Sequence, residues 1–160
     1  MTPSRKKNRL EKWLYNDGGF FVTICTKNRF WYFGDKDVGA DTIRLTTYGK
    51  IVEQCLLNIS SIYGDVVLAD YVIMPNHIHG ILFMDQGQKA IDNRPYGMMS
   101  KIIKGFKRAA TKQLHESGLT DFQWQKSFYD HVIRDPKDME RIQEYIWLNP
   151  YERENDEYYR

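Results

Sequence analysis

The 160-residue sequence has no long hydrophobic run, and no apolar segment approaches the roughly 18 residues that a membrane-spanning helix needs. Its basic start, Ser4-Arg5-Lys6-Lys7-Asn8-Arg9, is not followed by the apolar segment of a signal peptide. Internal repeats and low-complexity segments are missing as well. These absences argue against an integral membrane protein and a repeat array, and we expect a cytoplasmic protein without a membrane partner.

Cysteine is also scarce, and its two residues are Cys25 and Cys55. They stand far apart in apolar surroundings, without the Cys-x-x-Cys spacing of a zinc site. We therefore expect two buried free thiols rather than a disulfide or a structural zinc site. An excess of one charge is missing too, because the net charge is only +2. Any interface with nucleic acid must depend on where the charges lie rather than on their sum.

What the sequence does contain is the composition of a globular protein, with 42% hydrophobic and 28% charged residues. A chain of this length buries roughly 68–70% of its extended surface and fits one domain. We expect a single domain over residues 1–160, with a core at about 18–150, a basic N-terminal arm and a short charged C-terminal tail.

Hydrophobic patterns predict four strands separated by helices. Runs of β-branched and aromatic residues predict strands at Phe20–Thr26, Asp65–Met74, His77–Met84 and Tyr129–Arg134. Apolar residues at helical spacing predict helices from Thr46 or Thr47 to about Tyr63, over 97–116, and from Pro136 to about Leu148. The aromatic stretch Lys27–Asp41 is expected to be an irregular loop packed on the core. The hairpin through Pro75-Asn76 is expected to form the centre of the sheet.

The second strand of that hairpin begins with the sequence His-Ile-His. Because side chains alternate across a strand, His77 and His79 share one face with Ile81 and Phe83. Two imidazoles about 7 Å apart on a rigid strand can chelate a divalent metal. A structural histidine pair remains the alternative at this point, because a His-x-His spacing alone is a weak signal.

One face of the predicted helix over 97–116 is positively charged, with no acidic residue between Lys101 and His115. The residues of this face are Lys101, Lys104, Lys107, Arg108 and Lys112. A face of one sign indicates contact with nucleic-acid phosphates, and an ordinary solvated face is the alternative. The N-terminal arm, which contains Arg5, Lys6 and Lys7, either contacts phosphates or is a frayed terminus.

On the last predicted helix, Tyr145 and Asn149 are four residues apart and therefore lie on the same side. A phenol with a pKa of about 10 is a poor nucleophile unless a positive charge stabilises its anion. A metal held by His77 and His79 would supply that charge if this helix crosses the histidine face of the sheet. Packing of Tyr145 in the core is the alternative.

Four blocks of the sequence, in order, resemble a known family: Phe21–Arg29, Tyr71–Gly80, Trp124–Asp135 and Glu144–Pro150. Together they are similar to the REP-associated tyrosine transposases. These are a branch of the single-tyrosine HUH transposases, which are named for a His-hydrophobe-His metal motif. Linked blocks are far more specific than any one block alone. The resemblance implies an α+β fold, a ferredoxin-like antiparallel sheet with helices packed on it.

The resemblance also implies roles for individual residues. His77 and His79 would bind the metal, and Tyr145 would be the nucleophile. Asn149 corresponds to a metal-binding Gln of more distant relatives, and its side chain is one methylene shorter. The implied cofactor is Mg²⁺ or Mn²⁺, and the implied partner is single-stranded DNA with hairpins, such as REP-like sequences or insertion-sequence ends. The implied reaction is cleavage through a 5′-phosphotyrosine followed by rejoining to a 3′-hydroxyl.

Two other functions remain open at this stage. A non-catalytic module that binds DNA hairpins would keep the basic helix without needing Tyr145 or the histidine pair. An RNA-binding ferredoxin-like sheet would need exposed aromatic residues on its central strands, where the His-Ile-His strand offers only Phe83. The protein is expected to be a monomer or a homodimer, associated with the nucleoid when it binds DNA.

Overall fold

The computed structural model describes residues 19–35, 43–84, 95–150 and Tyr158 of the chain. The predicted N-terminal arm with Arg5, Lys6 and Lys7 lies outside the described residues, and so does most of the predicted C-terminal tail. The elements that carry the candidate site all fall inside the described ranges.

An antiparallel four-stranded sheet is the centre of the fold, with strand order β2-β3-β1-β4. Its strands are β1 (Gly19–Cys25), β2 (Val66–Ile73), β3 (His77–Met84) and β4 (Tyr129–Ile133). The helices are α2 (Thr47–Leu57), α3 (Ile59–Ile62), α4 (Pro95–Glu116) and α5 (Pro136–Leu148), and a 3-10 turn, η1, covers Lys27–Arg29. Helices follow β1 and β3, and this βαββαβ order confirms the predicted ferredoxin-like α+β fold.

The sheet centre differs from the prediction. The hairpin of β2 and β3 was expected at the centre, but the central pair is β3 and β1, and β2 lies at the edge. Burial explains the difference, because β1 is buried along nearly its whole length while the middle of β2 is only half-buried. A hairpin connection makes two strands neighbours, and it does not decide which of them receives a second partner.

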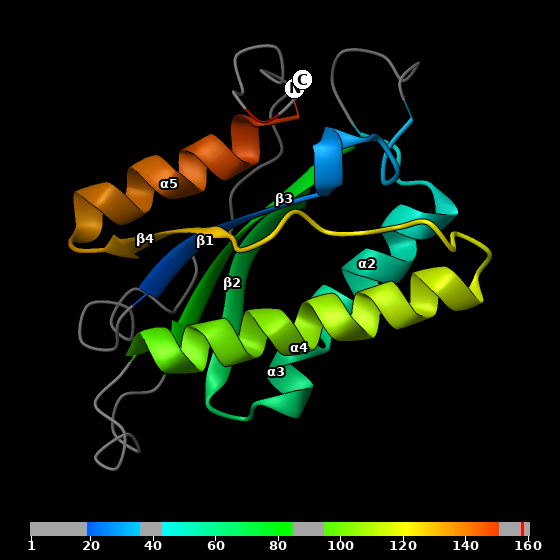
Figure 1. Ribbon diagram of the computed structural model, residues 1–160. Coiled ribbons are helices and arrows are strands. Elements are labelled where there is room, and N and C mark those ends of the chain that lie inside the picture. The colour runs from blue at the N-terminus through cyan, green and yellow to red at the C-terminus, as the bar shows by residue number, and fades with distance from the viewer. Residues whose placement is uncertain (1–18, 36–42, 85–94, 151–157, 159–160) are drawn as a thin grey trace.

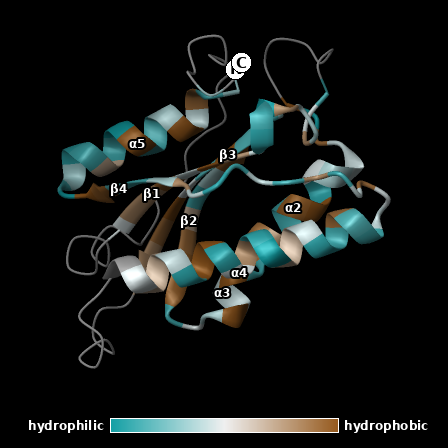
Figure 2. Cartoon of the chain, viewed as in Figure 1, coloured by the Kyte–Doolittle hydropathy of each residue, from teal (hydrophilic) through white to brown (hydrophobic). Residues whose placement is uncertain are grey.

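Helices cover both faces of the sheet, and each face has its own core (Figures 1 and 2). On one face, Phe20, Val22, Ile24, Ile78 and Leu82 pack with residues of α2 and α4. On the other face, β3 residues pack under α5. This second core consists of Ile81, Phe83, Met139, Ile142 and Ile146. Because β3 is buried throughout, the exposed aromatic sheet face that RNA binding would need is absent from this central strand.

The helix predicted from Thr46 or Thr47 to about Tyr63 is divided in two. Thr46 is its N-cap, as its Oγ1 accepts a hydrogen bond from the backbone N–H of Gly49. The first part ends at Leu57, and the short α3 starts after Asn58, whose ψ of −13° interrupts the helical path. Asn is a weak helix former, so a break at Asn58 is physically reasonable.

The two cysteines lie in the interior, as the sequence predicted. Cys25 and Cys55 are both buried and carry reduced thiols, and burial raises the pKa of the Cys55 thiol. Among the helices of the described ranges, none is long and apolar enough to cross a membrane.

Candidate functional site

His77 and His79 lie side by side on the face of β3 that α5 covers. Their ring centroids are 4.7 Å apart, and neither residue has any exposed surface. The alternation of side chains along β3 therefore placed both imidazoles correctly. Their neighbours across the sheet come from β1, where Cys25 pairs with His77 and Thr23 pairs with His79.

Hydrogen bonds hold both imidazole rings through Nδ1. The Nδ1 atom of His77 is 2.6 Å from Oδ1 of Asn76, and an amide oxygen can only accept. His77 therefore donates from Nδ1 and keeps its lone pair on Nε2. The Nδ1 atom of His79 is 2.9 Å from Oγ1 of Thr23. A partner on Nδ1 is the arrangement that orients a histidine to bind a metal through Nε2.

Tyr145 reaches the histidine pair from α5, so this helix does cross the histidine face of the sheet. Its hydroxyl is 3.4 Å from Nε2 of His79, and the two ring centroids are 5.2 Å apart. The Phe21 ring stacks on the imidazole of His79 with ring centroids 5.3 Å apart, and it meets the Tyr145 ring edge-on at 6.0 Å. Tyr145 is 38% exposed, which makes it the accessible member of a buried cluster.

Asn149 follows Tyr145 by one helical turn, and its side-chain oxygen has no hydrogen-bond partner among the residues that the structure describes. The residue is 3% exposed, and Oδ1 is one of two buried side-chain oxygens without a hydrogen bond in the described ranges; the other is Oδ2 of Asp130. A buried amide oxygen without a partner costs about 1–3 kcal/mol, which a metal or water would recover. Two imidazoles and an amide oxygen are suitable donors for a divalent cation.

The described residues offer few other metal ligands here. No group of three or more His, Cys, Asp or Glu side chains that could hold a metal occurs among them. Among the described residues, the candidate protein ligands of a metal at this site are the two histidines and Asn149. Such a set leaves coordination positions for water and phosphate oxygens, so the residues fit a weakly held Mg²⁺ or Mn²⁺.

Tyr158 covers the histidine pair, a contact that no pattern in the sequence predicts. Its ring centroid is 5.7 Å from that of His77 and 5.6 Å from that of His79. The guanidinium of Arg29 lies over the same ring at 5.5 Å, and Tyr129 packs against it at 5.7 Å. Because Tyr158 lies outside every motif, only the tertiary structure shows that it packs here.

The other tyrosines near the motifs are less suited to act as nucleophiles. Tyr71 lies on the edge strand β2 and donates its hydroxyl hydrogen to Glu53 at 2.9 Å. Burial, followed by the hydrogen bond and charge of Glu53, raises the pKa of Tyr71 to about 12. Tyr129 is 52% exposed, and its ring packs against Tyr158, with ring centroids 5.7 Å apart.

The basic face of α4 lies on the opposite side of the sheet from the histidine pair. Its exposed members are Lys101, Lys104, Arg108 and Lys112. Lys107 differs, because its ammonium donates to the backbone oxygens of Gln125 and Ser127 and burial lowers its pKa. Lys107 thus fastens the segment before β4 to α4.

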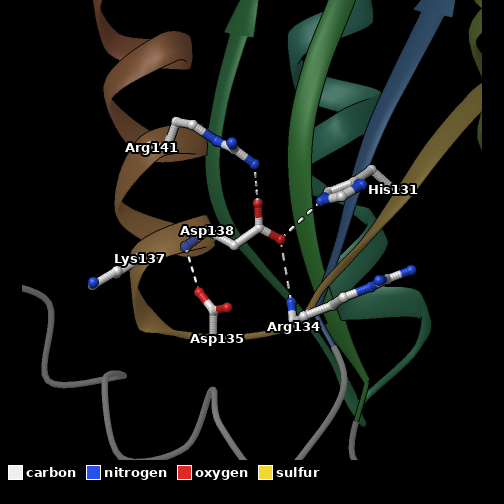
Figure 3. Close-up of a pocket in the computed structure, with 6 residues that line it drawn as sticks. All are labelled: His131, Arg134, Asp135, Lys137, Asp138 and Arg141. Atoms are coloured by element: carbon white, nitrogen blue, oxygen red, sulfur yellow. Dashed lines mark hydrogen bonds and ion pairs between the residues drawn. The ribbon is translucent and has the colours of Figure 1, made fainter.

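Asp138 anchors the start of α5 and so helps to position Tyr145 (Figure 3). Its buried carboxylate accepts hydrogen bonds from His131, from the backbone N–H of Arg134 and from Arg141. The N-cap Asp135 accepts from the backbone N–H of Asp138 at 2.8 Å, as the Asp-Pro signal predicted. Burial alone would raise the pKa of Asp138, but the three hydrogen bonds outweigh it and hold the pKa below its ordinary value.

Asp138→Asn should destabilise the protein at neutral pH, because an amide cannot accept from all three donors. We expect a loss of about 1–3 kcal/mol in the free energy of unfolding. A carboxylate with a lowered pKa stabilises the fold above its ordinary pKa of 3.8, and this stabilisation is lost as pH falls through the folded value. Denaturant unfolding at pH 7 and near pH 3 should measure this. The difference in the free energy of unfolding between the wild-type protein and the variant should be smaller at the lower pH. An equal difference at both would contradict the ionised network.

Comparisons with known proteins find relatives in sequence and in structure. No family model matches the chain. An uncharacterised protein of Haemophilus influenzae strain Rd is 32% identical, over 97% of this chain and 93% of that protein. The REP-associated tyrosine transposase of Escherichia coli K12 is 26% identical, over 83% of this chain and 66% of that protein.

A solved structure shares the fold. It is that of a REP-associated tyrosine transposase bound to a REP hairpin, with a TM-score of 0.57 at 23% identity. The match covers 94% of this chain and 74% of the other. The ferredoxin-like sheet and the helices packed on it are therefore common to both proteins.

Proposed function

We propose that the chain is a member of the family of the REP-associated tyrosine transposases and that it cuts and rejoins single-stranded DNA. The observation that carries the proposal is the Tyr145 hydroxyl, 3.4 Å from Nε2 of His79. A phenol and two imidazoles meet here from two elements far apart in the sequence. An amide oxygen without a partner follows one helical turn later, at Asn149. Metal-assisted phosphoryl transfer needs such a set of groups.

The proposed metal ligands are His77, His79 and Asn149. When bound there, Mg²⁺ or Mn²⁺ would polarise the scissile phosphate and stabilise negative charge beside Tyr145. Asn76 and Thr23 contribute by holding the imidazoles through Nδ1, which directs each Nε2 away from the backbone of β3.

Tyr145 supplies the nucleophilic oxygen. The phenol loses its proton to solvent, and its oxygen attacks phosphorus while the bond to the 3′ oxygen breaks. The products are a 5′-phosphotyrosine and a DNA strand with a free 3′-hydroxyl. Attack of a 3′-hydroxyl on the phosphotyrosine rejoins DNA and restores the phenol, so no nucleotide cofactor is required.

The proposed cycle includes a movement of the groups that cover the histidines. Neither imidazole has exposed surface, so a phosphate can reach them only when a covering side chain leaves. The Tyr158 ring contacts both imidazoles and is held by a cation–π contact with Arg29. A cation–π contact contributes about 0.5–1 kcal/mol or more, and it must break together with the ring contacts when Tyr158 moves away.

The same burial supports a second candidate, a protein that binds DNA hairpins without cutting them. In that case the histidines would remain covered, and the exposed basic face of α4 would provide the binding surface. The two candidates differ in one observable, because only the first forms a covalent bond between DNA and the protein.

Replacing Tyr145 separates the two candidates. Tyr145→Phe removes one oxygen and little packing, so the covalent adduct with a hairpin-bearing single strand should disappear while hairpin affinity stays within about twofold. Denaturing gels of reactions with Mn²⁺ would measure the adduct. Tyr129→Phe is the matched control, and it should still form the adduct. Adduct formation by Tyr145→Phe, or its loss in the control alone, would contradict the assignment.

The metal site can be tested without DNA. The double variant His77→Ala, His79→Ala should lose Mn²⁺ binding in calorimetry, while circular dichroism shows a retained fold. Asn149→Ala should weaken Mn²⁺ binding without lowering the melting temperature, because the oxygen that it removes has no protein partner. Unchanged Mn²⁺ affinity in the double variant would refute the site.

The basic face of α4 should contribute to affinity through phosphate contacts. Each contact to a single strand adds about 0.7 to the slope of log affinity against log salt concentration. Replacing Lys101, Lys104 and Arg108 by Gln should therefore reduce the slope by about 2. This slope can be measured by fluorescence anisotropy of a labelled hairpin over a series of salt concentrations. If slope and affinity stay at their wild-type values, the face is only solvated.

A further inference from the structure

Arg29 adopts a backbone conformation that costs free energy. Its φ is 55°, in the left-handed region that favours glycine, and the preceding Asn28 has a φ of 57°. Asn tolerates this region, whereas a residue such as Arg is less stable there by about 1–2 kcal/mol. Strain of this kind persists only where the surroundings enforce it, and it concentrates at functional positions. The strained turn after β1 therefore makes Arg29 a candidate for a functional role.

Hydrogen bonds enforce this turn, and one of them comes from the residue that orients His77. The backbone N–H of Arg29 donates to the backbone oxygen of Thr26 at 3.1 Å. The backbone oxygen of Arg29 accepts from Nδ2 of Asn76 at 3.3 Å, and Oδ1 of Asn76 accepts from Nδ1 of His77 at 2.6 Å. One amide side chain thus fixes the backbone of Arg29 relative to a proposed metal ligand.

The Arg29 guanidinium and the histidine pair have one aromatic ring as a common neighbour. The guanidinium is 5.5 Å from the centroid of the Tyr158 ring, and that centroid is 5.7 Å from the ring of His77 and 5.6 Å from the ring of His79. Figure 1 shows η1 and the last turn of α5 at the same end of the sheet, where β3 begins. When the Tyr158 ring leaves, as the proposed cycle requires, the vacated space borders the guanidinium and both imidazoles.

The reaction proposed at Tyr145 places negative charge on more than one oxygen. A phosphodiester has two non-bridging oxygens, and they carry the charge while the Tyr145 oxygen attacks. Where one of them is a ligand of a metal on the histidines, the other still needs a positive partner, and the side chains of Tyr145 and Asn149 carry no positive charge. A guanidinium suits this role, because its fork of N–H groups matches the geometry of phosphate and stays protonated.

We propose that Arg29 is a catalytic residue, whose guanidinium donates hydrogen bonds to a non-bridging oxygen of the scissile phosphate after the Tyr158 ring has left. The guanidinium exchanges an aromatic ring for an anion and transfers no proton. The bonds that form and break remain those of the attack by Tyr145: the bond from phosphorus to the phenol oxygen forms, and the bond to the 3′ oxygen breaks. The inference rests on the proposed function and adds a residue to its machinery.

The alternative role of Arg29 is only to hold the Tyr158 ring over the histidines. The two roles predict changes of opposite sign when the guanidinium is removed. Loss of a group that only holds the ring makes the histidines easier to reach, so the covalent adduct should form at the wild-type rate or faster. Loss of a donor to the scissile phosphate should slow adduct formation by about 10²–10³-fold, the usual effect of removing one such donor.

The test measures single-turnover adduct formation on a hairpin-bearing single strand, with Mn²⁺ and saturating protein. Arg29→Gly should form the adduct about a hundredfold more slowly than the wild-type protein. Glycine suits the positive φ of this position, so circular dichroism should show an unchanged fold. Arg29→Lys keeps the charge without the fork of donors, and it should have an intermediate rate.

Arg134→Ala is the matched control, because it removes a guanidinium far from the site. Arg134 is exposed and follows Ile133, which pairs with Gly19 at the end of the sheet away from His77. This variant should form the adduct at the wild-type rate.

A second substrate separates a contact with phosphate from a structural effect. A methylphosphonate at the scissile position replaces one non-bridging oxygen by a methyl group and exists as two diastereomers. With the diastereomer that lacks the oxygen contacted by Arg29, the rates of the wild-type protein and of Arg29→Gly should agree within about threefold. A structural defect would instead slow the variant by the same factor on every substrate.

An adduct that forms on the natural phosphate at the wild-type rate or faster in Arg29→Gly would overturn the inference and leave Arg29 with the role of holding Tyr158. A hundredfold defect that persists with both diastereomers would overturn it as well. Failure of the proposed function looks different, because the wild-type protein itself would then form no adduct. If the wild-type protein forms the adduct and Arg29→Gly forms it equally fast, the proposed function stands and only the role of Arg29 is removed.

Discussion

The packing of α5 on the histidine face of the sheet is the contact on which the site depends. Tyr145 belongs to α5 and Asn149 is the C-cap residue of this helix, whereas the histidines belong to β3, and only this packing brings them together. Apolar contacts with β3 residues hold the helix against the sheet, and on the helix they involve Met139, Ile142 and Ile146. Gln143 adds a hydrogen bond to Asp70 of β2, and Asp138 ties the start of the helix to His131. A shift of one helical turn would remove the nucleophile from the imidazoles.

The parts of the site that could be predicted are those governed by local periodicity. The period of a strand put both histidines on one face, and the spacing of a helix put Tyr145 and Asn149 on one side. The Asp-Pro signal gave the start of α5 correctly. Each of these features depends on residues within a few positions of one another, so the local sequence is sufficient to predict it.

The parts that could not be predicted depend on which segments meet. Thr23 and Phe21 contact His79 because β1 pairs with β3, and the expected sheet centre was wrong for the same reason: strand order is a long-range property. Lys107 was grouped with the basic face of α4 by helical spacing, yet the segment before β4 supplies carbonyl oxygens that hold its ammonium. Tyr158 comes from the tail and belongs to no pattern at all.

The central claim is that α5 and β3 form one metal-dependent site around Tyr145. Anomalous diffraction from crystals grown with Mn²⁺ tests it most directly. The predicted result is a single strong manganese peak within about 2.1 Å of Nε2 of His77, Nε2 of His79 and Oδ1 of Asn149, beside the Tyr145 hydroxyl. A manganese peak at another place, or no peak beside the two histidines at saturating Mn²⁺, would contradict this claim.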